Sequence, residues 1–579
     1  MNRLLRFAIA SLVTMSLLLV SCGGAVQPAA PAGDDAAAAP TAAATAEEPT
    51  KAAEVAPATA APAGPVKMKI FAPQLDYCCE DLPTNLFSLE AQKMFNIEFE
   101  WQLTTMDGNS AKELRQISLA SGDYPDVYML IPWIDQFSQL DLLKYGKEGV
   151  ILPLNDLIQE HAPNIQRAMQ DWPEFKPMIT APDGNIYGLV QWVECYHCTF
   201  GNKMWVNSKW LKALKLEVPK TTDEFQAMLE AFKTQDPNGN GVADEVPLSG
   251  SIEDYGTRVI PYLMNGFIYD DDRTYLILSD GKVDIAANKQ EWKDGLTYIK
   301  GLFDAGLIDP GAFTQNVEAF MKIGNNADAQ LLGTGAAMHP ATFVTTGPEA
   351  PYGADYDVIP PLQGPHANFS TYLHSVVPGA TFVLTNNASA EAQVAAIKLV
   401  DYMFSLEGQL RSNQGVEGVD WRRPQAGDVA LNKDADPLFA NIEQPEGSEP
   451  RNSHWGAGAQ YNNSLEFYDR WVQSTDPDEY YNWPGYERRL FEATNLYQGK
   501  ESPNLFPFWT MWPDPATADT VAMTKQNITD YVNQNALAFV TGSKDLKGDW
   551  DAYVAGFEQL DLAGYLASQQ KSYELSLAK

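Results

Sequence analysis

Residues 203–248 read KMWVNSKWLKALKLEVPKTTDEFQAMLEAFKTQDPNGNGVADEVPL and contain a complete helix signal followed by a loop rich in oxygen ligands. Thr221 and Glu224 have the spacing of a capping box, in which each side chain bonds the backbone N–H of the other. Apolar residues then recur at the i, i+3, i+4 and i+7 positions of one helix face, namely Phe225, Met228, Leu229 and Phe232. The stretch therefore predicts a helix that ends at Gln235 and packs one face on a core.

The loop at 236–245, DPNGNGVADE, follows this helix directly. Side-chain oxygens at its first, third and fifth positions, with glycine at the sixth, match the start of an EF-hand loop. The twelfth position, where an EF-hand keeps a bidentate Glu, is Pro247, which excludes a standard EF-hand. We expect a shortened Ca²⁺ loop, and an Asn-Gly turn with solvated acids is the alternative. The expected ligands are the side chains of Asp236, Asn238, Asn240, Asp244 and Glu245 and the carbonyl of Val242.

Together with other segments, this stretch resembles the family 1 extracellular solute-binding lipoproteins of ABC importers, in the calcium-loop branch that includes oligosaccharide binders. The other segments are SGDYPD at 121–126, DGNIYGL at 183–189, GAAM at 335–338, IPPLQGP at 359–365, GVEGVDW at 415–421 and FVTGSKDL at 539–546. No single segment is specific, but their order covers almost all of the chain after its leader. The resemblance implies a protein that captures a small solute and delivers it to ABC permease subunits. An oligosaccharide or sugar is the expected solute, and a peptide is the alternative.

The composition of the 579-residue chain limits the possible functions. The chain carries a net charge of −35, which disfavours binding to nucleic acid and to anionic membrane surfaces. We find no GxSxG, HExxH, Walker or GxGxxG motif in a supporting context. A secreted carbohydrate-active enzyme with two catalytic carboxylates is the rival class, but abundant acids are no evidence for such a pair. We predict a binding protein that is not an enzyme, and we expect a monomer.

The N-terminus predicts a lipoprotein leader and a tether. Arg3 and Arg6 precede an apolar run over 7–20, which is too short to span a bilayer and is typical of a signal peptide. The residues before Cys22 resemble the bacterial lipobox. This resemblance implies that residues 1–21 are removed and that Cys22 is acylated. Residues 22–66 consist mostly of Ala, Pro and Thr and predict a disordered tether. The lipid would be the only membrane contact, and would hold the protein on the periplasmic or cell-surface side.

The body of the chain begins with an α/β pattern. Residues 67–73, 96–103 and 126–130 alternate like strands, with helical segments between them, and Ser110 and Glu113 predict the start of a helix over 110–120. This order predicts a mostly parallel α/β sheet. The resemblance implies a two-lobed periplasmic-binding-protein-like fold of class II type, with a mostly parallel sheet in each lobe and a helical C-terminal region. Lobe one would hold 67–188 and 373–425, and lobe two 189–372 and 426–579.

Four cysteines remain after Cys22, in two close pairs, Cys78 with Cys79 and Cys195 with Cys198. An even number of cysteines outside the cytoplasm predicts disulfides, with three possible pairings. A bond between sequence neighbours is strained, so we expect two bridges that join 78/79 to 195/198. A thiolate metal site with His197 is the alternative.

Ligand contacts are expected where aromatic and polar side chains follow predicted strands or fall in the segments shared with the family. Flat rings suit the C–H faces of sugars, and a few placed polar groups suit their hydroxyls. The aromatic candidates are Trp133, Trp192, Tyr196 and Trp421. The polar candidates are Asp76 and Glu417, with Glu194, His197 and Asp420 close to the same segments. For each of them, a core or solvated position is the alternative.

Overall fold

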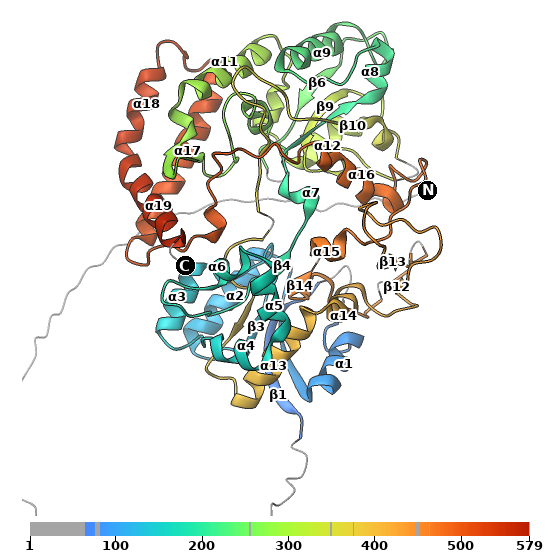
Figure 1. Cartoon of the computed structure of the whole chain (residues 1–579). Coiled ribbons are helices and arrows are strands. Elements are labelled where there is room, and N and C mark those ends of the chain that lie inside the picture. The colour runs from blue at the N-terminus through green and yellow to red at the C-terminus, as the bar shows by residue number, and fades with distance from the viewer. Residues whose placement is uncertain are drawn as a thin grey trace, which may run out of the picture. The chain divides into compact units, whose positions relative to one another are not determined.

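Two mixed sheets with helices on their faces make up the fold of this computed structural model (Figure 1). The structure describes residues 64–75, 81–253, 256–347, 350–374, 376–445, 448–449, 451–462 and 464–577. The predicted leader, most of the tether, and the segment with Asp76, Cys78 and Cys79 lie outside these ranges.

The first sheet has the strand order β11-β3-β1-β2. Its strands are β1 (Val66–Pro73), β2 (Ile97–Thr104), β3 (Val127–Met129) and β11 (Phe382–Leu384). β1 runs parallel to both β2 and β3, whereas β11 is antiparallel to β3. The parallel β-α-β-α-β start predicted from the sequence is confirmed, and β11 adds a late strand at one edge.

The second sheet has the order β10-β5-β9-β6. Its strands are β5 (Lys203–Asn207), β6 (Val246–Ser249), β9 (Leu332–Ala337) and β10 (Tyr356–Ile359). β5 is antiparallel to both β10 and β9, and only β6 and β9 are parallel. The prediction of a mostly parallel second sheet is therefore wrong. β5 and β9 are buried along their whole length, and burial on both faces does not reveal strand direction.

Short two-stranded pairings complete the strand structure. β4 (Trp192–Val193) pairs with β14 (Tyr461–Asn462), and β7 (Leu276–Ser279) pairs with β8 (Lys282–Ile285). β12 (Trp421–Arg422) pairs with β13 (Ala440–Asn441).

The helix predicted at the centre of the sequence forms as expected. It is α9 (Thr222–Thr234), with Thr221 as N-cap and Gln235 as C-cap. The Thr221 hydroxyl accepts the N–H of Glu224 at 3.1 Å, and the Glu224 carboxylate accepts the N–H of Thr221 at 3.2 Å. The four apolar residues of its predicted face are all buried, so the capping box and the stripe are both confirmed.

The helix predicted over 110–120 forms with a different cap. α2 (Gly108–Ser121) begins two residues earlier than expected, because the Asp107 carboxylate accepts the N–H of Ser110 at 2.8 Å. Ser110 therefore lies inside the first turn and is not the cap, which corrects the prediction.

The remaining helices pack around the two sheets. Those that follow or flank the first sheet in the chain are α1 (Leu86–Phe95), α3 (Gln139–Lys147), α4 (Asn155–His161), α5 (Pro163–Asp171), α6 (Phe175–Ile179), α13 (Ala390–Met403) and α14 (Leu406–Gln409). The others are α7 (Tyr196–Thr199), α8 (Ser208–Leu214), α10 (Val259–Met264), α11 (Gln290–Asp304), α12 (Val317–Gly324), α15 (Leu465–Tyr468), α16 (Trp483–Asn495), α17 (Ala518–Val540), α18 (Trp550–Gln559) and α19 (Leu562–Leu577). Among the described residues, no helix has both the length and the hydrophobicity that crossing a membrane requires.

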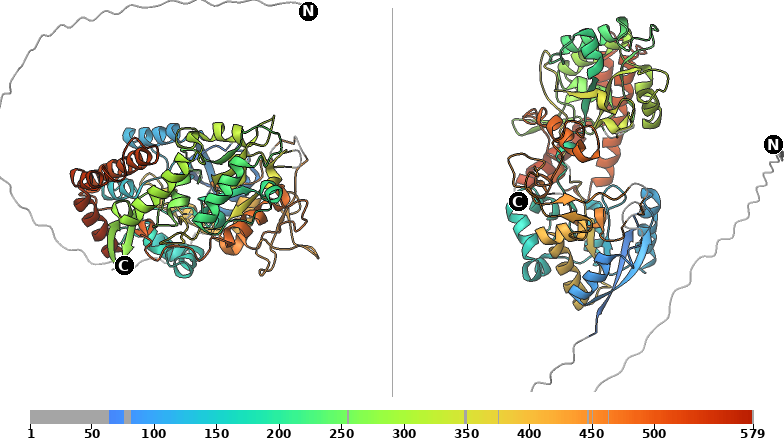
Figure 2. Two further views of the ribbon diagram at one scale, coloured as in Figure 1. Left: turned by 90° about the horizontal axis from the view of Figure 1, so that it is seen from above. Right: turned by 90° about the vertical axis from the view of Figure 1, so that its right-hand side faces the viewer.

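Each sheet has its own hydrophobic core. One core joins the first sheet to α1, α4, α5 and α13, and the other joins the second sheet to α9, α11 and the C-terminal helices. Figures 1 and 2 show the C-terminal helices, in red, beside α11. Tyr372, Leu505 and Phe508 pack against both cores, so these three residues lie where the two regions meet. The lobe boundaries given above stay a prediction.

A buried ion pair anchors α2 to the first sheet. The Arg115 guanidinium contacts the Asp135 carboxylate at 2.6 and 3.0 Å, and both side chains are almost fully buried. Arg115 also donates to the Gln136 carbonyl at 3.1 Å and lies 4.4 Å over the Phe137 ring. The pair is thus satisfied by hydrogen bonds on both sides, as a buried pair requires.

We expect Asp135→Ala to lower the free energy of unfolding by about 3–5 kcal/mol, because the Arg115 charge is then buried without a partner. Urea unfolding of the purified body would measure the change. Glu100→Ala is the control, because its pair with Lys67 at 3.3 Å is exposed and such pairs contribute about 0–1 kcal/mol. Equal effects of the two substitutions would contradict the structural role given to Arg115 and Asp135.

Candidate functional site

A cavity of about 930 Å³ lies between α16 and the segments around β12 and β13. The π-helical turn Leu410–Gln414 closes another side through Asn413 and Gln414. Its volume lies within the range of small-molecule sites, which is about 300–1,000 Å³. Aromatic and polar side chains share its wall, including Trp471, Trp483, Tyr486, Arg451, His454 and Gln473.

Trp483 is the most accessible ring of this cavity. It opens α16 directly before Pro484, and its side chain is 65% exposed. The ring packs edge-on against Tyr486 at 5.4 Å, while Tyr486 is fixed by accepting the Ala341 N–H at 3.1 Å. Trp471 lies parallel to Phe439 at 6.1 Å. A supported ring with a free face is what a flat, partly apolar ligand needs.

Several charged groups of the wall neutralise one another. Arg422 pairs with Asp428 at 2.6 Å, and Arg451 pairs with Asp420 at 3.1 Å. The hydrogen bond and charge of Asp428 raise the pKa of Arg422, and those of Arg422 lower the pKa of Asp428. Four further acids leave the wall with an excess of negative charge, namely Glu443, Asp476, Glu479 and Glu487. The cavity therefore suits a polar, uncharged ligand better than an anion.

His454 contributes a neutral ring to the same wall. Burial lowers its pKa below the ordinary value, and its Nδ1 atom has no hydrogen-bond partner. A buried polar atom without a partner is costly, so this nitrogen is a point of local strain in the wall.

Residues 91–410 match the family described as bacterial extracellular solute-binding protein, which is more than half of the 579 residues. The chain belongs to this family. Membership makes it a solute-binding component of transport and not an enzyme, which confirms both predictions.

Two curated relatives cover most of this solute-binding protein. The fructooligosaccharide ABC transporter substrate-binding protein FusA of Streptococcus pneumoniae is 28% identical over 491 residues, which is 83% of this chain and 85% of FusA. Lipoprotein LipO of Bacillus subtilis is 23% identical over 388 residues, which is 65% of this chain and 72% of LipO.

Solved structures show the same fold. FusA in complex with kestose, and a FusA EF-hand mutant in complex with fructo-nystose, each match with a TM-score of 0.65 and 26% identity over 88% of this chain and 99% of FusA. An extracellular solute-binding protein from Bifidobacterium longum subsp. infantis matches with a TM-score of 0.72 and 19% identity, over 89% of this chain and 99% of the other. The predicted periplasmic-binding-protein-like fold is confirmed.

Two of the predicted aromatic contacts have core positions in the solute-binding protein. The Trp192 ring is buried and stacks on Trp172 at 5.0 Å. The Trp421 ring is buried, donates its Nε1–H to the Gly415 carbonyl at 3.1 Å, and lies under the Arg423 guanidinium at 4.8 Å. Neither residue lines the cavity at α16, and their assignment as ligand contacts stays a prediction.

The other predicted contacts have varied positions. Trp133 is 57% exposed after β3, at the carboxyl edge of the first sheet, and stays a candidate. The Tyr196 hydroxyl lies 2.7 Å from Asn495 Oδ1, and burial raises its pKa to about 12. Glu417 makes two 3.0 Å contacts with Arg423, outside the cavity wall. Glu194 accepts the Leu465 N–H at 2.7 Å.

Trp483, Trp471 and Arg451 line the cavity but were not among the predicted ligand contacts. Trp483 carried a usable signal, because a large ring at the first turn of a helix beside Pro484 is held at the helix end. Arg451 and Trp471 come from irregular segments, where no periodicity marks a side chain as facing a cavity.

The predicted calcium loop joins α9 to β6 and turns sharply. Asp236, Gly239 and Gly241 have positive φ angles of 47°, 71° and 74°. The Asp236 carboxylate accepts the N–H groups of Asn240 and Gly241, both at 3.1 Å. A chain that bends around its first carboxylate brings later side chains toward one point.

The donor set of this loop fits a hard cation. The Asn238 and Asn240 amides lie 3.0–3.2 Å from the Asp244 oxygens, and rotating either amide presents its oxygen there. Glu245 Oε1 is buried without a partner, and burial followed by the charges of Asp244 and Asp236 raises its pKa. No ion pair in the described part of the chain involves these three acids. The Val242 carbonyl already accepts the Asp244 N–H at 3.0 Å.

The cysteines pair differently from the prediction. Cys195 and Cys198 form a disulfide across α7, so the expected bridges from these residues to 78/79 are wrong. The two cysteines lie one helical turn apart, which brings their sulfurs together locally. His197 lies 3.6 Å from Cys195 Sγ and 3.4 Å from the Glu487 carboxylate. Because both sulfurs are in the disulfide, the structure offers no thiolate for the alternative metal site.

The buried side chain of Lys203 binds the backbone of the α7 segment. It is fully buried in β5, and its ammonium donates to the carbonyls of His197 at 2.8 Å and Phe200 at 2.5 Å. Burial lowers its pKa to about 7. Burying the charged Lys203 ammonium therefore lowers the free energy of unfolding by an amount that depends on pH.

We expect Lys203→Met to remove a pH-dependent part of the stability. The folded pKa of about 7 lies below the ordinary value of 10.5, so between these values the unfolded chain binds the extra proton. The stability of the unmodified protein relative to the variant should therefore increase as the pH rises from about 7 toward 10. Urea unfolding between about pH 6 and pH 9 measures this difference. Lys209→Met, at an exposed site, is the control, and a pH-independent offset for Lys203→Met would refute the assignment.

Proposed function

We propose that this solute-binding protein captures an oligosaccharide or sugar and delivers it to the permease of an ABC importer. The observation that carries the proposal is the cavity at α16, which combines the exposed Trp483 ring with a polar wall whose charges are partly paired. Sugars are uncharged and present C–H faces to rings and hydroxyls to polar groups, and this wall offers both kinds of partner. The relative FusA is named for fructooligosaccharide, which supports the same ligand class.

Capture would proceed as a two-lobed clamp. A ligand that touches both regions at once favours the closed arrangement over the open one, which is how ligands shift such equilibria. Tyr372, Leu505 and Phe508 contact both cores and are our candidates for the hinge side chains. The loaded form would then dock on the permease. The protein would act as a monomer held to the membrane by a lipid on Cys22, and the relative LipO is named a lipoprotein.

We expect kestose, or another oligosaccharide, to raise the melting temperature of residues 67–579 by mass action. Trp483→Ala should weaken binding roughly tenfold, because about 1.4 kcal/mol or more of ring contact is lost. Met523→Ala, another exposed apolar position, is the matched control. Recovery of the stabilising glycan intact supports the proposal, whereas its cleavage overturns the proposal. Stabilisation by peptides alone would instead favour the peptide-binding alternative.

We further propose that the 236–245 loop holds a structural Ca²⁺. Asp236, Asp244 and Glu245 would supply carboxylate oxygens, Asn238 and Asn240 amide oxygens, and Val242 its carbonyl. Ca²⁺ takes six to eight oxygen ligands, and waters would complete the set. Its charge would stabilise three neighbouring acids that have no cationic partner in the described residues. A relative described with an EF-hand mutant supports this assignment.

Chelation should lower the melting temperature while leaving the affinity for the sugar nearly unchanged, because the loop lies outside the cavity wall. Asp244→Ala should abolish the stabilisation by added Ca²⁺, whereas Asp304→Ala on the exposed face of α11 should retain it. Differential scanning calorimetry with and without chelator measures the first effect. A large loss of sugar affinity without a change in melting temperature would contradict a structural role.

A further inference from the structure

A second cavity, of about 310 Å³, lies against α17 and shares no lining residue with the cavity at α16. Hydrocarbon and aromatic side chains form most of its wall, among them Val259, Pro261, Phe313, Val532, Ala536 and Leu537. Tyr275 and Trp292 also line it, with their rings edge-to-face at 5.5 Å. Such a wall suits an apolar molecular body.

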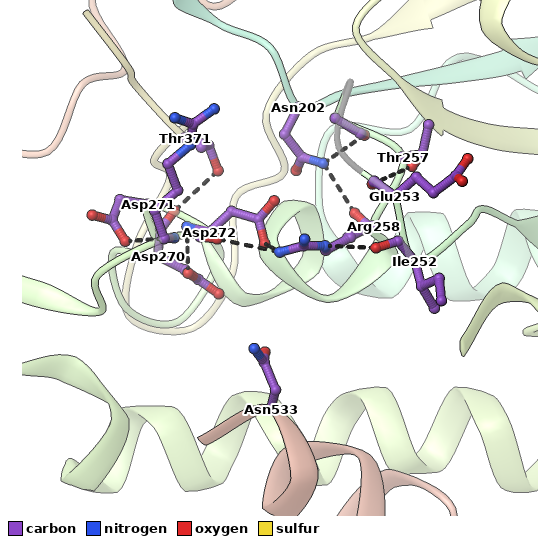
Figure 3. A network of polar contacts seen from close by, with 12 residues as sticks. Asn202, Ile252, Glu253, Thr257, Arg258, Asp270, Asp271, Asp272, Thr371 and Asn533 are labelled. Atoms are coloured by element: carbon purple, nitrogen blue, oxygen red, sulfur yellow. Dashed lines mark hydrogen bonds and ion pairs between the residues drawn. The ribbon is translucent and has the colours of Figure 1, made fainter. Parts of the chain in front are cut away.

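One carboxylate in the wall of this cavity has an oxygen without a hydrogen-bond partner. Asp270 is 1% exposed, and its Oδ1 accepts the Asp272 N–H at 2.8 Å. Its Oδ2 is buried and has no hydrogen-bond partner. Figure 3 shows this carboxylate directed into the space above Asn533, which stands on α17. Burial, followed by the charge of Asp272, raises the pKa of Asp270 well above its ordinary value.

The neighbouring charges are already engaged. Arg258 contacts the Asp272 carboxylate at 3.1 Å and the Ile252 carbonyl at 3.2 Å (Figure 3). Asp271 accepts the N–H groups of Arg273, Thr274 and Tyr275 at 2.8–3.0 Å. The side-chain oxygen Oδ1 of Asn533 accepts the Tyr275 hydroxyl at 2.6 Å. Asp270 is therefore the acid of this cluster with a buried oxygen that accepts no hydrogen bond.

We propose that this cavity binds a small organic ammonium ion, with its nitrogen at Asp270 Oδ2 and its hydrocarbon body between α10 and α17. The ammonium would supply both the missing charge and the missing hydrogen bond. The Tyr275 and Trp292 rings would add cation–π attraction. A metal ion fits worse, because Ca²⁺ or Mg²⁺ needs about six oxygens, whereas the wall has one carboxylate oxygen without a hydrogen bond and includes the Arg258 cation. The site goes beyond the sugar capture proposed above.

Titration calorimetry with n-butylammonium and with the neutral n-butanol tests the charge requirement. The two probes have nearly the same shape, so the wall contacts cancel in the comparison. We expect the ammonium to bind at least about tenfold more tightly, because a hydrogen bond to a charged group contributes about 1.5–3 kcal/mol.

Asp270→Asn tests the residue. The amide keeps the shape of the side chain and cannot ionise, so the melting temperature should not fall, while the affinity for n-butylammonium should fall at least about tenfold. Asp304→Asn on α11 is the matched control and should bind as the unmodified protein does. Ala536→Met, which fills the cavity from α17, should also abolish binding.

Three results would overturn the proposal. They are the absence of saturable n-butylammonium binding, equal affinities for the ammonium and the alcohol, and undiminished binding by Asp270→Asn. None of them bears on the sugar site, whose own thermal-shift test uses a different cavity.

Discussion

The pairing of β11 with β3 is the long-range constraint on which the rest of the molecule depends. It completes the first sheet with a strand that the chain supplies only after building the second sheet. The contact between the Thr385 hydroxyl and the Pro125 carbonyl, 260 residues apart in sequence, reinforces it. Because the chain must leave and return at this place, the second sheet is an excursion between two strands of the first. The segment that leaves the first sheet and the segment that returns to it are therefore forced to lie side by side.

Features encoded within a few residues could be predicted from the sequence. The Thr221–Glu224 capping box is an exchange of hydrogen bonds between two residues, and the buried stripe of α9 repeats within four turns. The same reasoning went wrong at α2, where Asp107, three residues before Ser110, is the N-cap. Neighbouring residues can each act as the N-cap of a helix. The helix begins at the one whose carboxylate reaches the free N–H groups of the first turn.

Features that depend on distant segments were beyond prediction. Trp421 stands in a family segment, yet its ring is buried in a small cluster with Phe439 and Phe467, which come later in the chain. The direction of β5 depends on which neighbours the fold places beside it. The cavity at α16 draws its wall from segments between Asn413 and Glu487 that have little regular structure. The location of this cavity depends on tertiary packing, which the periodicity of the sequence does not predict.

The position of the C-terminal helices has a consequence for biosynthesis. The core of the second sheet includes Val532, Phe539, Tyr553 and Tyr565, from α17, α18 and α19. A chain emerging from its N-terminus can therefore close the first core before the second, because the second awaits the last residues to be made. Until then much of the apolar surface of the second sheet is uncovered. The end of the chain thus sets the moment at which folding is finished.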